Sequence, residues 1–246
     1  MLFVLLSGGQ VQCFNASTLE SMWVYTDPQG GRCESSVRYD DGYIYVGFFA
    51  STTVGGFACI SVTDEDPSSQ TEEKVPIWRN SSLGSYYWDG AWSNENYVFV
   101  ITNGGTLCCI DKKTGDAVQT VATGQTSRSN ISYYNGRIYW ANQSGYLYSY
   151  NLTADGRLDM ENLIEPLYFG GASTSTPAIY NNRVYIGISN GGNFGVEGYG
   201  ILVGDINPET GAMSAAYVVP TDGYPQTSGL IVNGYEEEDG YVYVYF

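Results

Sequence analysis

The sequence predicts an all-β protein built from about six copies of one short, strand-rich unit. The first observation is a gapless self-match: residues 1–19, MLFVLLSGGQVQCFNASTL, align on residues 97–115, YVFVITNGGTLCCIDKKTG. The second is the composition, because 31 Gly and 23 Tyr with only 15% charged residues suit short strands joined by tight turns. The third is a hairpin signal that recurs before four of the copies. Self-similarity of this kind marks repeat architectures such as propellers.

The most regular part of each unit is a strand of alternating aromatic and aliphatic residues. It follows a turn such as Asp41-Gly42, Asn135-Gly136 or Asp239-Gly240, which tolerates the positive φ angles of two-residue hairpins. Spacings of 42, 54, 40, 46 and 58 residues separate the central aromatic residues, as expected for propeller blades with variable loops. We call these residues the anchors: Phe3, Tyr45, Phe99, Tyr139, Tyr185 and Tyr243.

Three further strands are predicted around each anchor strand. One precedes it, a second follows it and ends at Asn or Asp, and a third leaves that turn, as in residues 21–25 and 74–78. Four antiparallel strands per unit make a β-propeller blade, so we predict about five to six blades with partial terminal blades. We expect a single propeller domain over residues 1–246. It is expected to be a segment of a longer protein, or to combine its two ends into one closing blade.

Charge and composition exclude several classes of function. The formal net charge of −16 repels nucleic acid and anionic membrane surfaces, so neither is an expected partner. His is absent, which removes the commonest zinc ligand and general base. Five Cys, an odd number without small-domain spacing, argue against a disulfide framework. The start, MLFVLL, aligns with a later strand and is predicted to be a strand rather than a signal peptide; no stretch approaches the ~20 apolar residues of a membrane span.

The turns after the second strands carry a family resemblance. Residues 13–23, CFNASTLESMW, resemble the tryptophan-docking repeat A-x-D-x-x-T-G-x-x-x-W of quinoprotein-type propellers. Residues 109–115 match its first half, with Gln119 where Trp is expected, and residues 206–211 match in part. The chain thus resembles the quinoprotein-like (PQQ-type repeat) superfamily, as a non-enzymatic bacterial member. Trp23 and Trp78 lie near docking-type positions.

The same resemblance raises the question of a quinone cofactor. Quinone-dependent dehydrogenases of that superfamily carry a disulfide between adjacent cysteines, and this chain has Cys108-Cys109. However, Cys109 aligns with Cys13 and Ser149 at a strand position that favours a small residue, so packing is the preferred interpretation. No carboxylate and amide ligand set for calcium can be placed. We therefore expect no cofactor, with PQQ and calcium only under the alternative of a quinoprotein dehydrogenase.

Two acidic runs are predicted to be solvated hairpin loops. Residues 64–73, DEDPSSQTEE, offer clustered oxygen ligands but lack the spacing of an EF-hand loop, so calcium binding is the less favoured interpretation. Residues 236–239, EEED, form a charged hairpin tip. Neither run is assigned a catalytic role.

Two loops are candidates for a binding surface. Aromatic residues between units, in residues 86–92, suit stacking on sugars or anchoring a protein, although packing between blades is the preferred interpretation. The long loop 189–200 is a second candidate, because long loops in compact folds are often functional. The candidate binding residues are Tyr86, Tyr87, Trp88, Asp89, Trp92, Asn193 and Phe194. No catalytic or metal-ligating residue is assigned.

These observations predict a non-catalytic binding or scaffold propeller of an exported or cell-surface bacterial protein. Its loop-lined faces are expected to engage a protein or glycan partner, without membrane insertion. Two enzymatic alternatives stay open: a quinoprotein dehydrogenase with calcium, and a carbohydrate-active propeller with two carboxyl groups about 5 to 9.5 Å apart in a cleft. Enzymatic activity is thus left undecided, with a binding function favoured.

Overall fold

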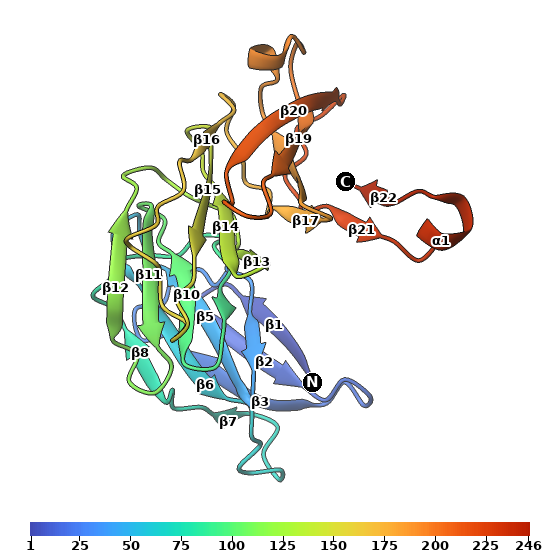
Figure 1. The fold of residues 1–246 in the computed structure, drawn as a ribbon. Helices are drawn as coiled ribbons and strands as arrows, with labels where there is room; N and C mark the ends of the chain where they lie inside the picture. The colour runs from blue at the N-terminus through green and yellow to red at the C-terminus, as the bar shows by residue number, and fades with distance from the viewer. The chain divides into compact units, whose positions relative to one another are not determined.

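The protein is an all-β structure of five four-stranded sheets and one two-stranded sheet (Figure 1). This computed structural model describes the backbone of residues 1–246 and every side chain except that of Asp239. Blades 2 to 5 each have four antiparallel strands, whereas the first and last sheets depart from this pattern. The predicted blade architecture with partial terminal units is therefore confirmed.

The strands follow one another in chain order within nearly every blade. Blade 1 contains β1 (Leu2–Leu6), β2 (Gln10–Phe14), β3 (Ser21–Thr26) and β7 (Glu72–Glu73). Blade 2 contains β4 (Arg38–Asp40), β5 (Tyr43–Phe49), β6 (Gly55–Ser61) and β8 (Trp78–Asn80). Blade 3 contains β9 (Trp92–Ser93), β10 (Tyr97–Ile101), β11 (Thr106–Asp111) and β12 (Ala117–Ala122).

The second half of the chain repeats this plan. Blade 4 contains β13 (Ser132–Tyr134), β14 (Arg137–Ala141), β15 (Tyr146–Asn151) and β16 (Leu167–Tyr168). Blade 5 contains β17 (Ala178–Tyr180), β18 (Arg183–Ile188), β19 (Gly200–Ile206) and β20 (Met213–Pro220). Blade 6 contains β21 (Leu230–Val232) and β22 (Tyr243–Tyr245). Two short helices lie in loops, η1 (Gly192–Phe194) and α1 (Glu236–Asp239).

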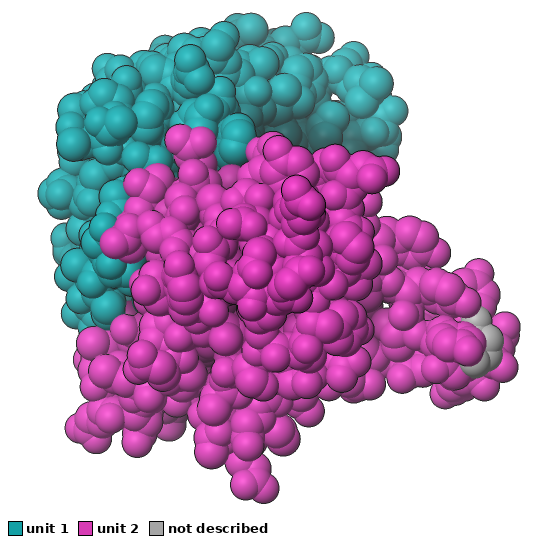
Figure 2. Space-filling view, turned by 90° about the horizontal axis from the view of Figure 1, so that it is seen from above, with its two compact units in different colours: residues 1–124 teal, residues 125–246 magenta. Residues whose placement is uncertain are grey.

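The chain divides into two compact units, residues 1–124 and 125–246, which Figure 2 shows in separate colours. Blades 1 to 3 belong to the first unit and blades 4 to 6 to the second. Each unit has its own buried core: the first contains two apolar clusters and the second contains one. The expectation of a single domain over residues 1–246 stays a prediction.

The self-match in the sequence is a match in strand register. Phe3 of β1 lies opposite Cys13 of β2, and Phe99 of β10 lies opposite Cys109 of β11. Both β2 and β11 also have a β-bulge directly after that cysteine in their pairing with the next strand. MLFVLL is therefore mostly the strand β1, as predicted.

Every anchor in blades 1 to 5 faces a smaller residue across the strand pair. In blades 2, 4 and 5 the pairs are Tyr45 with Cys59, Tyr139 with Ser149, and Tyr185 with Val203. A small partner leaves room for the aromatic ring beside it on the same face of the sheet. This rule explains why three of the five cysteines, Cys13, Cys59 and Cys109, lie opposite anchors.

Two predicted elements differ from the structure. Residues 74–78 do not form one strand: β7 pairs in parallel with β3 of blade 1, and β8 pairs with β6 of blade 2. Pro76 lies between them and has no N–H to donate to a ladder, so the chain changes sheets there. In blade 6 the expected two-residue Asp239-Gly240 hairpin is replaced by the helical turn α1, which ends at Gly240 with φ of 77°. The side chain of Asp239 lies outside the described residues.

The turns between second and third strands share one hydrogen-bonded design. Asp111 Oδ1 accepts hydrogen bonds from the N–H groups of Lys113 and Thr114, and Asn15 and Asn207 cap their turns in the same way. The turn then closes through a left-handed residue, which is Gly115 or Gly211 in two copies. These are the turns on which the family resemblance was based.

The docking tryptophans connect each turn to a neighbouring blade. Trp78 Nε1 donates to the carbonyl of Lys112 at 2.8 Å, and a Cβ at Gly115 would lie 2.5 Å from Trp78 Cδ2. Trp23 Nε1 donates to the carbonyl of Val62 at 3.3 Å. The two docking-type positions expected from the sequence are thus used as contacts between consecutive blades.

Arginine replaces tryptophan in the second unit. Arg137 of blade 4 is buried and donates from Nη1 and Nη2 to the carbonyls of Pro208 and Glu209, at 3.4 and 3.0 Å. Those carbonyls belong to the turn of blade 5 that corresponds to the turn receiving Trp78. A guanidinium can reach two neighbouring carbonyls at once because its donors form a planar fork.

Candidate functional site

The loop between β8 and β9 is fixed to the first unit by one buried tyrosine. The Tyr86 ring is fully buried, 5.2 Å from the Phe57 ring, and a Cβ at Gly47 would lie 2.4 Å from Tyr86 Cβ. Its backbone N–H donates to Phe48, and its carbonyl accepts from Ser35 Oγ at 3.2 Å. Burial raises the pKa of the Tyr86 hydroxyl. Tyr86 is therefore the internal support of this loop rather than part of an exposed surface.

The two residues after Tyr86 present aromatic rings near the surface. The rings of Tyr87 and Trp88 are stacked, with centroids 5.0 Å apart and an angle of 22° between the planes. Tyr87 also packs on Phe49, again at 5.0 Å. Trp88 has a left-handed backbone with φ of 68° and is 37% exposed. We call Phe49, Tyr87 and Trp88 the aromatic cluster.

Asp89 shapes the loop from within. Its side chain is buried, and Oδ2 accepts a hydrogen bond from the Tyr87 N–H at 3.2 Å. A buried carboxylate that accepts backbone N–H groups holds a turn in place and offers little surface to a ligand. The same loop is also tied down through Ser85, whose Oγ donates to the carbonyl of Thr52 at 2.9 Å.

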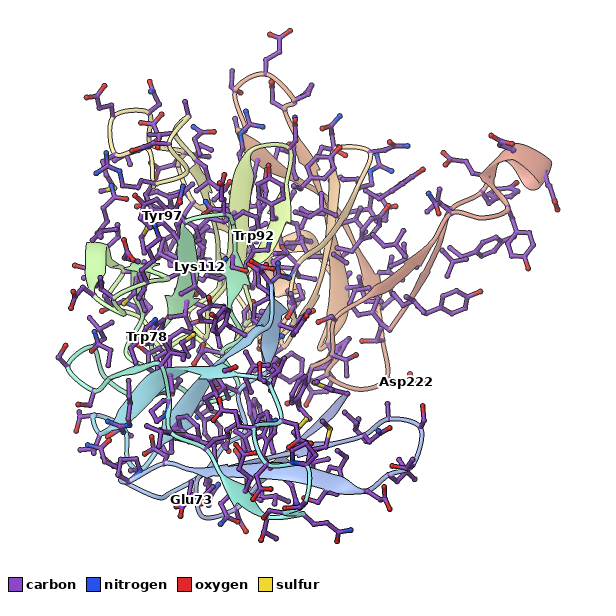
Figure 3. All side chains as sticks on the ribbon, turned by 90° about the horizontal axis from the view of Figure 1, so that it is seen from below. Glu73, Trp78, Trp92, Tyr97, Lys112 and Asp222 are labelled. Atoms are coloured by element: carbon purple, nitrogen blue, oxygen red, sulfur yellow. The ribbon has the colours of Figure 1, made fainter. Side chains whose placement is uncertain are left out.

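Trp92 is not part of the aromatic cluster, because it belongs to a strand of blade 3. It sits in β9 opposite Phe99, and their ring centroids are 5.7 Å apart. Figure 3 labels Trp92 close to Lys112, and the Lys112 ammonium donates to the carbonyl of Asn94, the second residue after Trp92. Trp92 is thus half-buried beside a charged network.

That charged network joins blades 2 and 3. Lys112 Nζ donates to Asp40 Oδ2 at 2.9 Å, Ser93 Oγ also donates to Asp40, and Arg38 Nε donates to Ser93 Oγ at 3.0 Å. Burial would raise the pKa of Asp40, but hydrogen bonds from Ser93 and Lys112 outweigh it and hold that pKa below its usual value. The carboxylate is therefore ionised and paired at neutral pH, which suits a link between blades rather than proton transfer.

The acidic insertion, residues 64–73, folds around the buried side chain of Lys74. The Lys74 side chain is 3% exposed and pairs with Glu72 at 2.9 Å and Glu65 at 3.4 Å. It lies 5.9 Å from the Trp23 ring and also donates to the carbonyl of Thr63. Two acidic side chains of the run thus pair with a lysine. Within the part of the chain that the structure describes, no group of three or more His, Cys, Asp or Glu is placed to hold a metal.

The cysteines are buried free thiols. Burial raises the pKa of Cys13 and Cys59 to about 11 and the pKa of Cys33 and Cys108 to about 12. Side chains of successive strand residues point to opposite faces, so Cys108 and Cys109 are arranged for packing.

The residues therefore do not fit a quinone held beside a vicinal disulfide. The carboxylates of Asp27, Asp40 and Glu72 are each paired with a basic side chain.

The second candidate loop, residues 189–200, lies in the second unit. Asn193 Nδ2 donates to the carbonyl of Phe169 at 3.4 Å, and a Cβ at Gly170 would lie 2.1 Å from that nitrogen. Phe194 packs against the apolar core of the unit. Both predicted residues thus tie the loop to its blade, and their role in binding stays a prediction.

Sequence reasoning missed the basic residues that join structural elements: Lys74, Lys112 and Arg137. One signal was present, because Arg137 and Arg183 each stand two residues before an anchor, in RIYWAN and RVYIGI. A scarce cation at a repeated position in an acidic chain indicates a fixed contact. Lys74 had no such signal, because its partners come from an insertion without a counterpart in the other blades.

Comparison with known proteins places the repeats in a family. A family model described as outer membrane protein assembly factor BamB matches residues 68–224. No curated protein matches the chain. No helix among the described residues has the length and apolar character needed to cross a bilayer.

Solved structures give the same fold at low sequence identity. BamB from Moraxella catarrhalis matches with a TM-score of 0.62 and 12% identity, over 94% of this chain and 76% of that one. The computationally designed protein Ika8 matches with a TM-score of 0.64 and 13% identity, over 98% of this chain and 64% of that one. The fold is thus that of a PQQ-like β-propeller. With its family match spanning most of its length, the chain belongs to the family described as outer membrane protein assembly factor BamB.

Proposed function

We propose that this chain is a non-catalytic, protein-binding scaffold of an exported or cell-surface bacterial protein, and that it engages its partner through the aromatic cluster. The observation that carries the proposal is the stacked pair of Tyr87 and Trp88 on a loop fixed by buried neighbours. Rigid aromatic side chains bind with little loss of conformational entropy, which is why Trp and Tyr dominate binding hot spots. Tyr86 and Asp89 are the support for this surface, so their contribution is indirect.

Family membership supports the same choice. The family is named for a factor that assembles outer membrane proteins, which is a protein-binding task. An acidic surface and the paired state of Asp40 and Glu72 fit binding better than catalysis. A glycan partner stays an alternative, since exposed aromatic rings also stack on sugars.

A photo-crosslinking amino acid at position 88 tests the proposal in the bacterial host. We expect crosslinks to one defined protein from position 88 and none from position 168. Position 168 is the control because Tyr168 is also an exposed aromatic residue, at 54%, but lies on a strand of blade 4, outside the aromatic cluster. Trp88→Ala should then weaken binding of the purified partner by roughly 30-fold, as for an aromatic hot spot. Equal crosslinking from both positions would count against the proposal. A glycan array that gave hits abolished by Trp88→Ala would replace the protein partner with a sugar.

A further inference from the structure

A pocket opens between blades 2 and 3 of the first unit, at the end of the blades where β5 begins. Its volume is about 350 Å³, several times the roughly 30 Å³ that one water molecule occupies in the liquid. Both blades beside it are complete four-stranded sheets. Its lining includes the exposed side chains of Asp41, Tyr43, Ile77, Glu95 and Lys113. The pocket is therefore accessible from solvent and large enough for one side chain of a ligand.

Aromatic and aliphatic surface forms part of this lining. The ring of Tyr43 is 38% exposed, and the aliphatic side chain of Ile77 is exposed as well. The buried anchor Tyr45 also lines the pocket, because residues two apart on a strand point to the same face of the sheet. An aromatic ring beside an aliphatic group suits a ligand with a planar end and an apolar stem.

The charges at the pocket favour a cation. Asp41 and Glu95 are exposed, and within the described part of the chain neither carboxylate forms an ion pair. The charge of Lys112 is compensated, because its ammonium pairs with Asp40 at 2.9 Å. Residues 1–124 contain 14 Asp and Glu against 6 Lys and Arg, so the field of the whole unit also attracts positive charge.

Blade 4 shows what fills the corresponding place. Tyr43 stands two residues before the anchor of blade 2, and Arg137 stands two residues before the anchor of blade 4. The Arg137 guanidinium is buried against the turn of the next blade, where it donates to the carbonyls of Pro208 and Glu209 at 3.4 and 3.0 Å. Blade 2 has no guanidinium of its own at this position, and the pocket lies there instead.

Trp78 takes over only the first of those two contacts. In the turn of blade 3, Lys112 corresponds to Pro208 and Lys113 corresponds to Glu209. Trp78 Nε1 donates to the carbonyl of Lys112 at 2.8 Å, and Figure 3 labels both residues. Among the residues that the structure describes, none donates a hydrogen bond to the carbonyl of Lys113. A guanidinium in the pocket would thus find the acceptor that Glu209 provides in blade 5.

From these observations we propose that the pocket binds an arginine side chain in a basic segment of a partner polypeptide. Asp41 and Glu95 supply the negative charge, and the carbonyl of Lys113 accepts a hydrogen bond from the guanidinium. The plane of the guanidinium stacks on the Tyr43 ring, and the methylene groups of the arginine pack on Ile77. Arginine suits such a site because its donors form a rigid fork and its planar group stacks on aromatic rings.

The acidic residues at the pocket select a polypeptide over other sources of arginine. Free arginine carries its own carboxylate, which Asp41 and Glu95 would repel, whereas the same group in a polypeptide is a neutral amide. A second copy of this chain is disfavoured because each copy carries a formal net charge of −16.

This pocket is separate from the aromatic cluster. Tyr43 and Phe49 are the first and last residues of β5, so they lie about 20 Å apart along the strand. The arginine site therefore stands or falls independently of the proposed function.

The probe is the capped peptide acetyl-Gly-Arg-Gly-amide, titrated into the isotopically labelled chain and followed by NMR. We expect saturable shifts of the backbone amides of Tyr43 and Lys113. Matched peptides carry lysine, which lacks the planar fork, or citrulline, which lacks the charge. Each should bind at least about fivefold more weakly than the arginine peptide. Equal binding of the three peptides, or no shift with the arginine peptide, would overturn the proposal.

Removal of the carboxylates tests the charge requirement. Asp41→Asn and Glu95→Gln should each weaken binding of the arginine peptide roughly fivefold, as for exposed charge pairs. Asp41→Asn keeps the turn, because Asn135 has the same left-handed backbone at the equivalent position of blade 4. Asp116→Asn is the matched control, since Asp116 is exposed after the turn of blade 3 but does not line the pocket. Unchanged binding by the double variant of Asp41 and Glu95 would contradict the assignment.

A variant that fills the pocket from within tests the comparison with blade 4. Tyr43→Arg should abolish binding of the arginine peptide, because the chain then supplies its own guanidinium, as Arg137 does in blade 4. Tyr43→Phe keeps the aromatic ring and should bind the peptide as the wild type does. Undiminished binding by Tyr43→Arg would show that the peptide lies elsewhere.

Two further measurements check the source of the arginine. Free arginine that bound as tightly as the capped peptide would overturn the assignment to a polypeptide. Self-association of the wild type in sedimentation, abolished by Tyr43→Arg, would assign the pocket to a second copy of the chain and overturn it as well. We expect weaker binding of free arginine and no difference in sedimentation between the two proteins.

Discussion

Leu19 holds a left-handed backbone conformation, with φ of 60°, at the turn position where Gly115 has φ of 78°. The two turns are otherwise equivalent: Asn15 caps the first as Asp111 caps the second. A residue with a Cβ is strained in this region by roughly 1–2 kcal/mol. Leu19 is 65% exposed, so its side chain gains little from burial. The first turn therefore carries strain that the second avoids.

Leu19→Gly should stabilise the protein by about 1 kcal/mol through relief of that strain. Urea unfolding followed by tryptophan fluorescence measures the change. The reciprocal variant Gly115→Ala should be destabilising, because its Cβ would lie 2.5 Å from Trp78 Cδ2. A lower unfolding midpoint for Leu19→Gly would contradict the assignment of strain.

Lys74→Met should destabilise the first unit by about 3 kcal/mol, since removing one partner of a buried ion pair leaves the other without compensation. Glu72 would lose its partner while it still accepts hydrogen bonds from Glu65 and Asp66 N–H groups, at 2.9 and 2.8 Å. Lys113→Met is the matched control, because Lys113 is exposed on a turn. Urea unfolding of both variants should separate them clearly; similar midpoints would show that Lys74 is not structural.

The same ion pair predicts an acid-sensitive contribution to stability. Burial would raise the pKa of Glu72, but hydrogen bonds from Lys74 and the backbone, with the lysine charge, hold it below its ordinary value. A carboxyl with a lowered folded pKa stabilises in full above its unfolded pKa of roughly 4.3, and the contribution disappears as pH falls through the folded value. Glu72→Gln should flatten the loss of stability that occurs as the pH falls below about 4.3.

Glu73→Gln is the control for that titration, because Glu73 is exposed on the same short strand and Figure 3 labels it near the periphery. Its pH profile should follow the wild type. Parallel profiles for all three proteins would contradict a role for Glu72 in acid sensitivity.

Arg137→Lys should destabilise the second unit by about 2 kcal/mol, because a lysine cannot reproduce the fork that reaches Pro208 and Glu209. Arg137 Nε also donates to Asn151 Oδ1 at 2.8 Å, and this contact would be lost too. Arg183→Lys provides the comparison, since its exposed pair with Asp205 is worth about 0–1 kcal/mol. Chemical denaturation that ranked the two variants in the opposite order would refute the docking role of Arg137.

The sequence predicted the blade plan because its signals are local. Alternation around the anchors and Asn or Asp turn caps are signals within single hairpins, and the self-match made Phe3 and Phe99 equivalent, which their matching strand partners confirm. The parallel strand β7 was missed because it depends on an insertion folding back around Lys74. Lys74 pairs with acidic residues of an insertion that the other blades lack, so no repeated pattern in the sequence marks it.

The sequence located the candidate site but could not predict which of its side chains are buried and which are exposed. For the aromatic run, the sequence favours packing between blades and leaves a binding surface as the alternative; in the structure, some of its residues are buried and others lie near the surface. Tyr86 and Asp89 point inward, whereas Trp88 is exposed. Adjacent residues in an irregular loop have no fixed period, so only tertiary contacts such as the one between Tyr86 and Phe57 decide which side chain faces solvent.

The turn that accepts the hydrogen bond from Trp78 of blade 2 also closes the hairpin between β11 and β12 of blade 3. Because one turn serves both blades, their folding is linked. If the turn at Gly115 opened, blade 3 would lose a hairpin and blade 2 would lose the cover of its indole together. In repeats coupled in this way, the interface between neighbouring blades contributes to the stability of both, so the two blades unfold together. Blades 2 and 3 should therefore exchange their core amides at a common rate, as a single cooperative folding unit.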